Sequence, residues 1–170
     1  PPQDHKVILP ETMPSKRSEE PKIALFDVNE IELGEKIGSG AFSNVYEIKS
    51  FRPIENGMNA NPKRSCHTTR RHLTRHALRE ETGKARYAAK FLKQELILED
   101  SDAFENAARD LEREASMMAS IDHRNILKVR GLACNGIESY AVMGRSDGFF
   151  VIFDRLQETL AERINLWRRQ

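Results

Sequence analysis

Positions 37–45 read IGSGAFSNV and join two segments whose apolar residues alternate with polar ones. Residues 31–37 and 43–51 both show this alternation, which is typical of half-buried β-strands. Two residues of the turn, Gly38 and Gly40, lack a Cβ atom, so backbone N–H groups there can approach phosphate oxygens closely. The segment therefore predicts a β-hairpin with a glycine-rich turn. Taken alone, it fits an ordinary hairpin as well as a phosphate-binding loop.

The next predicted strand, residues 85–92, carries a lysine among apolar neighbours. Lys90 is flanked by Ala88, Ala89, Phe91 and Leu92. A lysine at such a position either extends its ammonium group to solvent or pairs with an anion, because an unpaired buried charge is unfavourable.

A glutamate lies on the apolar side of the helix that we predict for residues 100–121. The apolar residues of this segment recur at three- and four-residue steps, as in an amphipathic helix. Glu114 stands three residues after Leu111 and four before Met118, so helical geometry places it at or beside the apolar stripe. Such a carboxylate either reaches water at the edge of the stripe or meets a cation. Because Lys90 and Glu114 would each satisfy the other, we predict that they form an ion pair.

The order of these features resembles the N-terminal, ATP-binding lobe of eukaryotic protein kinases. The glycine-rich loop of that family is G-x-G-x-x-G-x-V; Gly38, Gly40 and Val45 match it, and Ser43 replaces the third glycine. The A-x-K strand and the helix with an inward glutamate follow in the family's order. Residues 122–126, DHRNI, are similar to the family's H-P-N-I link, and GSGAFSNVY looks most like a Ser/Thr kinase.

The resemblance implies an α+β fold and a phosphate-positioning pair. The fold would be a five-stranded antiparallel sheet with one main helix, followed by the first helix of the C-terminal lobe. Lys90 would bind the α- and β-phosphates of ATP, and Glu114 would hold Lys90 in place. Met118 and Val129 would belong to the hydrophobic column that links the helix to the sheet.

The resemblance also implies the remaining ATP contacts. Val45 and Ala88 would sandwich the adenine, and Phe153 would be the gatekeeper. The backbone of Asp154 and Leu156 would meet the adenine edge. The glycine-rich turn and its flanks would complete the cofactor site with Ile37, Gly38, Ser39, Gly40, Ala41, Phe42 and Ser43.

The rest of the chain divides by composition. Residues 1–24 hold five of the seven prolines among polar residues, so we predict a flexible lead-in. Residues 25–156 would form the kinase-like lobe. Within that lobe, residues 52–83 break the strand pattern and predict a basic, mobile insertion between the second and third strands. Residues 157–170 would begin the C-terminal lobe, with Leu160, Ile164 and Trp167 at helical spacing.

Overall composition indicates a globular domain. The chain is 39% hydrophobic and 31% charged, and its formal net charge of +1 gives no general reason to expect a nucleic-acid partner. Cys66 and Cys134 form no CxxC pair, so we expect neither a disulfide framework nor a zinc framework. We therefore predict an intracellular protein, cytoplasmic or nuclear. There is no run of 18 apolar residues, and we predict no membrane partner.

The sequence lacks the two motifs that carry phosphoryl transfer, H-R-D-L-x-x-x-N and D-F-G. Without them, no residue positions the substrate hydroxyl and none holds Mg²⁺. We therefore predict no catalytic residue and no metal ligand in these 170 residues, and no kinase activity from them alone. The expected parent is a longer Ser/Thr kinase that uses ATP, Mg²⁺ and a protein substrate. A pseudokinase whose lobe serves as an interaction module fits the same residues.

The basic segment 63–79, KRSCHTTRRHLTRHALR, allows several interpretations. A solvated basic loop is the simplest, and a nuclear address or an acidic docking partner fits the same charges. Nucleic-acid binding through this segment is a weaker alternative function. Cys66, His67, His72 and His76 suggest zinc, but adjacent Cys66 and His67 fit the usual ligand spacing poorly.

Overall fold

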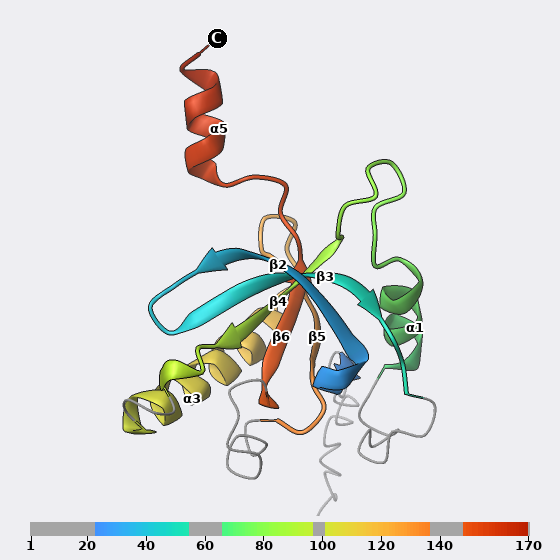
Figure 1. Ribbon diagram of the computed structural model, residues 1–170, viewed down its shortest axis with the longest axis vertical. Coiled ribbons are helices and arrows are strands. Elements are labelled where there is room, and N and C mark those ends of the chain that lie inside the picture. Colours follow the sequence, from blue (N-terminus) through green and yellow to red (C-terminus); the bar gives the residue numbers. More distant parts are fainter. Residues whose placement is uncertain (1–22, 55–65, 97–100, 137–147, 170) are drawn as a thin grey trace, which may run out of the picture.

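A six-stranded mixed sheet forms the centre of the computed structural model, which describes residues 23–54, 66–96, 101–136 and 148–169 (Figure 1). The strand order is β1-β5-β6-β4-β3-β2. The strands are β1 (Ala24–Phe26), β2 (Ile31–Ser39), β3 (Ser43–Phe51), β4 (Tyr87–Leu92), β5 (Val129–Ala133) and β6 (Phe150–Asp154). The helices are the 3₁₀ turn η1 (Val28–Glu30) and the α-helices α1 (His67–Arg75), α3 (Ser101–Ala119) and α5 (Leu160–Trp167).

The glycine-rich turn closes a hairpin between β2 and β3, as the sequence predicts. These strands are antiparallel, and the β3–β4, β4–β6 and β5–β6 pairs are antiparallel too. The β2–β3 register shifts at several points, so the hairpin contains irregularities before its turn. The general α+β class is confirmed.

The predicted five-stranded antiparallel sheet is wrong in one respect, because a sixth strand is present and runs parallel to its neighbour. Strand β1 pairs with β5, with Ala24 opposite Gly131 and Phe26 opposite Ala133. A Cβ atom at position 131 would lie 3.1 Å from the Ala24 carbonyl oxygen and 3.1 Å from Ile152 Cδ1, so a glycine lets β1 approach closely. The predicted lead-in was therefore slightly too long, since buried Ala24 already belongs to β1; residues 1–22 of that lead-in lie outside the described residues.

The described part of the predicted basic insertion is a packed structure and not a solvated loop. Within it, α1 places Leu73 in the core, where it is 1% exposed, and Ala77 is buried one turn later. A β-bridge between Leu78 and Ala85 then leads towards β4. Leu73 and Ala77, four residues apart, form the apolar face that packs against the core. The many charged residues of the segment make this face hard to recognise in the sequence. Residues 55–65 of the insertion lie outside the described part of the chain.

An ion pair fixes α1 to the start of the fold. Arg70 of α1 forms an ion pair with Glu30 of η1. The Arg70 guanidinium also lies 4.6 Å from the centroid of the Phe26 ring and donates a hydrogen bond to a backbone carbonyl of β1. Glu30 is buried and accepts two further hydrogen bonds, from the N–H groups of Asp27 (2.9 Å) and Ile54 (2.9 Å). This buried carboxylate is therefore paired with a cation and accepts three hydrogen bonds, which offsets the cost of burying its charge.

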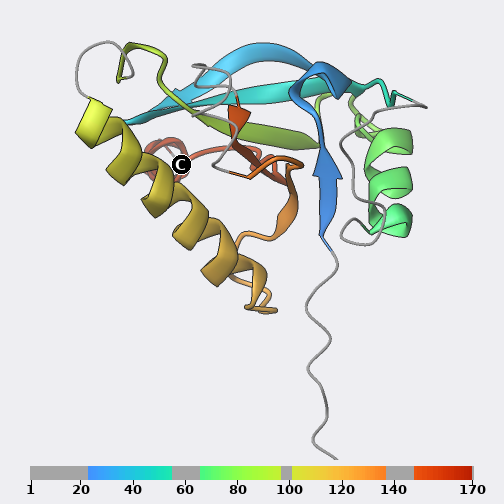
Figure 2. The same ribbon diagram turned by 90° about the horizontal axis from the view of Figure 1, so that it is seen from below.

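Helices α3 and α1 lie at opposite ends of the sheet (Figure 2). The amphipathic pattern predicted for residues 100–121 is found in α3, which buries Phe104, Ala108, Leu111 and Ala115 and packs against β4 and β5.

Helix α5 extends away from the sheet, within the segment where the sequence predicts a helix (Figure 1). It buries none of its residues. Of the helices in the described ranges, none combines the length and the apolar character needed to cross a membrane.

Candidate functional site

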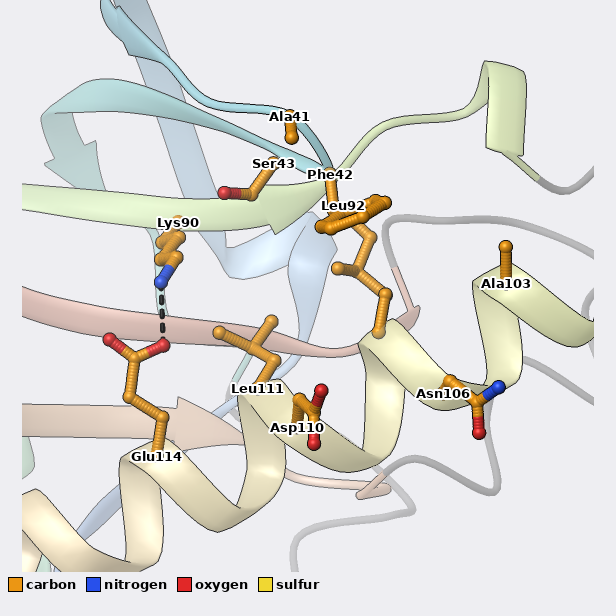
Figure 3. Close-up of a pocket in the computed structure, with 11 residues that line it drawn as sticks. Ala41, Phe42, Ser43, Lys90, Leu92, Ala103, Asn106, Asp110, Leu111 and Glu114 are labelled. Carbon is orange, nitrogen blue, oxygen red and sulfur yellow. Dashed lines mark hydrogen bonds and ion pairs between the residues drawn. The ribbon is translucent and has the colours of Figure 1, made fainter.

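The predicted ion pair between β4 and α3 is confirmed. Lys90 Nζ lies 2.6 Å from Glu114 Oε2, and the ammonium group points down from β4 to the carboxylate rising from α3 (Figure 3). The side chains are 24% and 42% exposed, respectively. The pair is therefore half-buried and remains accessible to a ligand from the adjoining hollows.

A cleft of about 580 Å³ adjoins this pair and collects most of the predicted ATP-contacting residues. Its lining from the sheet and the segment after β6 includes Ile37, Gly38, Val45, Ala88, Lys90, Phe153, Asp154 and Leu156. Glu114 and Met118 of α3 line it as well. Sequence reasoning missed Leu127, a partly buried residue of the segment that leads into β5.

Strand register explains why these side chains meet. Val45 lies opposite Lys90, and Ala88 lies opposite Phe153. Directly opposed residues share a sheet face, and so do residues two apart on one strand. Ala88 and Lys90 therefore point to the same side as Val45 and Phe153. Gly38, opposite Val45, continues this face into β2 without adding a side chain.

A smaller hollow of about 320 Å³ lies on the other side of the ion pair. Three residues of the glycine-rich turn line it, Ala41, Phe42 and Ser43, together with Lys90 and Glu114 (Figure 3). The structure thus divides the predicted turn contacts between two hollows that meet at the ion pair.

Two predicted turn contacts, Ser39 and Gly40, line neither hollow. Ser39 Oγ donates to Asn44 Oδ1 (2.9 Å), and Gly40 N–H donates to the Ser43 carbonyl (2.8 Å). Both therefore make their hydrogen bonds within the hairpin.

The side chain of Asp154 is held by β5. Arg130 Nε and Nη2 donate to its two carboxylate oxygens at 2.9 and 2.6 Å. The hydrogen bonds that Arg130 donates to Asp154 raise the pKa of Arg130. The next residue, Arg155, reaches Glu47 of β3 at 3.6 Å. These two pairs, which sequence reasoning missed, fix the segment that leaves β6 along the cleft.

The mouth of the cleft ends at the start of α5. Thr159 and Glu162 line it and form a capping box. Glu162 Oε2 accepts from Thr159 N–H at 2.6 Å, and this hydrogen bond lowers the pKa of the Glu162 carboxyl. The T-x-x-E spacing is a recognisable sequence signal for such a cap, and it could have placed the helix start.

The zinc hypothesis gains no support from the described residues. No group of three or more His, Cys, Asp or Glu side chains within them is arranged to hold a metal ion. The rings of His72 and His76 lie close together, with 4.6 Å between centroids and 39° between their planes. Cys66 Sγ accepts a hydrogen bond from Thr69 Oγ1 (3.1 Å), and burial raises the pKa of Cys134.

No protein-family model matches this chain, and no curated protein matches it either. Apolar side chains from four strands, β2, β3, β4 and β6, line the way to the Lys90 ammonium group, which the Glu114 carboxylate holds from behind. Such an arrangement suits a flat apolar ring joined to an anionic group.

Proposed function

We propose that this chain is the ATP-binding lobe of a protein kinase, in which the larger cleft takes the adenine and Lys90 contacts the phosphates. The observation that carries the proposal is the 2.6 Å contact between Lys90 and Glu114 beside the glycine-rich turn. A Lys–Glu pair between a strand and the following helix is the arrangement by which kinases position the α- and β-phosphates.

The dimensions and lining of the cleft support adenine as the occupant. A volume of about 580 Å³ lies within the range of small-molecule sites. Val45 and Ala88 supply apolar surface on the sheet side, and Phe153 is buried beside them. The backbone of Asp154 and Leu156 runs along the cleft edge, where donors and acceptors for the adenine would be needed.

The ammonium of Lys90 would donate hydrogen bonds to phosphate oxygens while Glu114 keeps it oriented. A lysine without this partner would lose orientation and gain rotamer freedom. The Gly40 N–H already donates a hydrogen bond to the Ser43 carbonyl, so in this conformation other N–H groups of the turn would contact the phosphates.

Transfer of the γ-phosphoryl group to a protein Ser or Thr hydroxyl belongs to the proposed activity of the complete kinase. The base and Mg²⁺ ligands of that step are carried by motifs that this sequence does not contain. The role proposed for these 170 residues is nucleotide binding and phosphate positioning.

Calorimetric titration of the chain with ATP and with adenosine tests this role. Replacing Lys90 removes a charge-assisted contact of about 1.5–3 kcal/mol, so Lys90→Met should weaken ATP binding roughly 10- to 100-fold. Adenosine carries no phosphate, so its affinity should be unchanged. Lys49→Met is the matched control, because Lys49 is an exposed residue of β3 that does not line the cleft.

The proposal fails if the wild-type chain binds neither ligand. It also fails if folded Lys90→Met binds ATP as tightly as the wild type. Equal losses for ATP and adenosine would place Lys90 in general support of the cleft and away from the phosphates.

A further inference from the structure

A polar cavity of about 400 Å³ lies apart from the Lys90–Glu114 ion pair. It shares one lining residue, Asp154, with the nucleotide cleft. Its walls come from α1, the segment that follows α1, and strands β4, β5 and β6. Three arginines dominate the lining, Arg79, Arg86 and Arg130, and His72 and Tyr87 complete its donors.

The Nε atom of one of these arginines has no acceptor among the described residues. This residue is Arg86, whose Nε atom is buried. Its main chain is fixed on both sides, because its N–H donates to Ala77 (2.8 Å) and its carbonyl accepts from Arg155 (2.8 Å). The Arg86 guanidinium also forms no ion pair with a carboxylate of the described residues, so its positive charge is left for an anion in the cavity. Arg155 Nε is also unpaired, but it belongs to a residue that lines the nucleotide cleft.

The carboxylates of the cavity do not fill this need. Asp154 is engaged by Arg130 through two hydrogen bonds. Glu81 lies exposed. Arg79 donates a hydrogen bond to the Arg155 carbonyl at 2.6 Å, and within the described ranges it forms no ion pair with a carboxylate. Positive charge from Arg79 and Arg86 is therefore in excess in this cavity.

We propose that this cavity binds a phosphate group. A phosphate monoester carries nearly two negative charges near neutral pH and offers three strong acceptor oxygens. Guanidinium groups from separate segments match that geometry and charge. A volume of about 400 Å³ also leaves room for part of the molecule that carries the phosphate.

The site depends on the basic segment whose role the sequence left open. His72 lies on α1, and Arg79 follows that helix. Packing of α1 through Leu73 and Arg70 holds both against the sheet beside Arg86. The proposal is independent of the nucleotide cleft, since it requires neither Lys90 nor Glu114.

Calorimetry with inorganic phosphate on the full 170-residue chain tests the proposal. The Lys90→Met chain serves as the background, because this substitution should weaken phosphate contacts at the nucleotide cleft. Arg86→Gln and, separately, Arg79→Gln should each weaken phosphate binding about tenfold or more. Arg75→Gln is the matched control, because Arg75 is an exposed arginine of α1 outside the cavity and its loss should leave the affinity unchanged. The imidazole resonances of His72 should shift on phosphate addition.

A phosphoserine peptide and its unphosphorylated counterpart distinguish the source of the phosphate. Much tighter binding of the phosphopeptide than of inorganic phosphate would assign the site to a phosphorylated protein, and equal affinities would assign it to a free phosphate. The proposal is overturned if the Lys90→Met chain binds neither probe. It is equally overturned if Arg86→Gln and Arg79→Gln, shown to be folded by circular dichroism, bind phosphate as well as the parent does, or if Arg75→Gln loses as much affinity as they do.

Discussion

Two ion pairs, Lys90–Glu114 and Arg70–Glu30, act on different segments and differ in burial. The first is half-exposed and links β4 to α3; the second is buried and links α1 to η1. The exposure of each pair determines how much it contributes to folding stability and whether a ligand can reach it. A half-exposed pair adds little to stability and is available to a ligand, whereas breaking a buried pair leaves an uncompensated charge.

Glu114→Gln should weaken ATP binding less than Lys90→Met does. The amide keeps the shape of the side chain and can still accept a hydrogen bond from Lys90. Pairs at this exposure contribute about 0.2–1 kcal/mol, which corresponds to a loss of ATP affinity of about 1.4- to fivefold. Calorimetry against Glu112→Gln, which removes the same charge from α3 away from the cleft, measures this. A larger loss than that of Lys90→Met would contradict the orienting role.

Glu30 should make folding stability sensitive to acid. Burial alone would raise the pKa of its carboxyl, but hydrogen bonds from Arg70, Asp27 and Ile54 bring the pKa below the ordinary 4.5. A carboxyl whose pKa is lowered in the folded state stabilises that state above its unfolded pKa and loses this contribution as the pH falls through the folded value. Urea unfolding should therefore show stability declining below about pH 4.5.

Glu30→Gln should reduce the free energy of unfolding at pH 7 by about 3–5 kcal/mol and flatten the acid dependence. Glu32→Gln, two residues further along, removes a carboxylate from an exposed pair and should change stability little at pH 7. An unaltered acid dependence in folded Glu30→Gln would show that other groups govern it.

At the scale of elements, α1 is part of the folded core, and its apolar contact can be measured. Leu73→Ala removes a side chain that is 1% exposed and should destabilise the protein by about 2–5 kcal/mol in urea unfolding. Leu78→Ala, at an exposed position shortly after the same helix, should stay within about 0.5 kcal/mol. Equal effects from the two substitutions would mean that α1 does not pack as described.

The elements that the sequence predicted well have strong local patterns. Strands β2 and β3 and helix α3 show clear periodicity, and β4 is an apolar run that contains Lys90. The Lys90–Glu114 pair could be predicted because each of these charges is unfavourable in an apolar setting without a partner. What was missed depends on distant partners. Strand β1 has three residues, and its place depends on Gly131 far along the chain. Arg70 looked like one charge among many in a basic run, because its partner Glu30 belongs to a different segment.

At the scale of the whole molecule, α5 lies outside the core, and the fluorescence of its tryptophan can test this position. Trp167 is the only tryptophan of the chain and is 59% exposed. Its fluorescence should therefore resemble that of a hydrated indole in the folded protein and change little when urea unfolds the sheet, while circular dichroism reports the transition.

The same fluorophore can detect association. Leu160 and Leu166 are exposed on the same helix, and exposed apolar surface favours contact between molecules. Emission that shifts to the blue only at high protein concentration, and reverts on dilution, would indicate such contact. A blue-shifted emission that persists at low concentration would mean that α5 packs against its own chain.

The parallel pairing of β1 with β5 has a consequence for the order in which the chain can assemble. The β2–β3 hairpin joins neighbouring residues and can close as soon as both strands have left the ribosome. Strand β1 is synthesised before them, yet its partner Gly131 emerges much later. Strand β1 is therefore made first of the described strands but can join the sheet only late, after β5 has been synthesised. Until then, the edge of β1 that pairs with β5 is exposed and can pair with strands of other molecules.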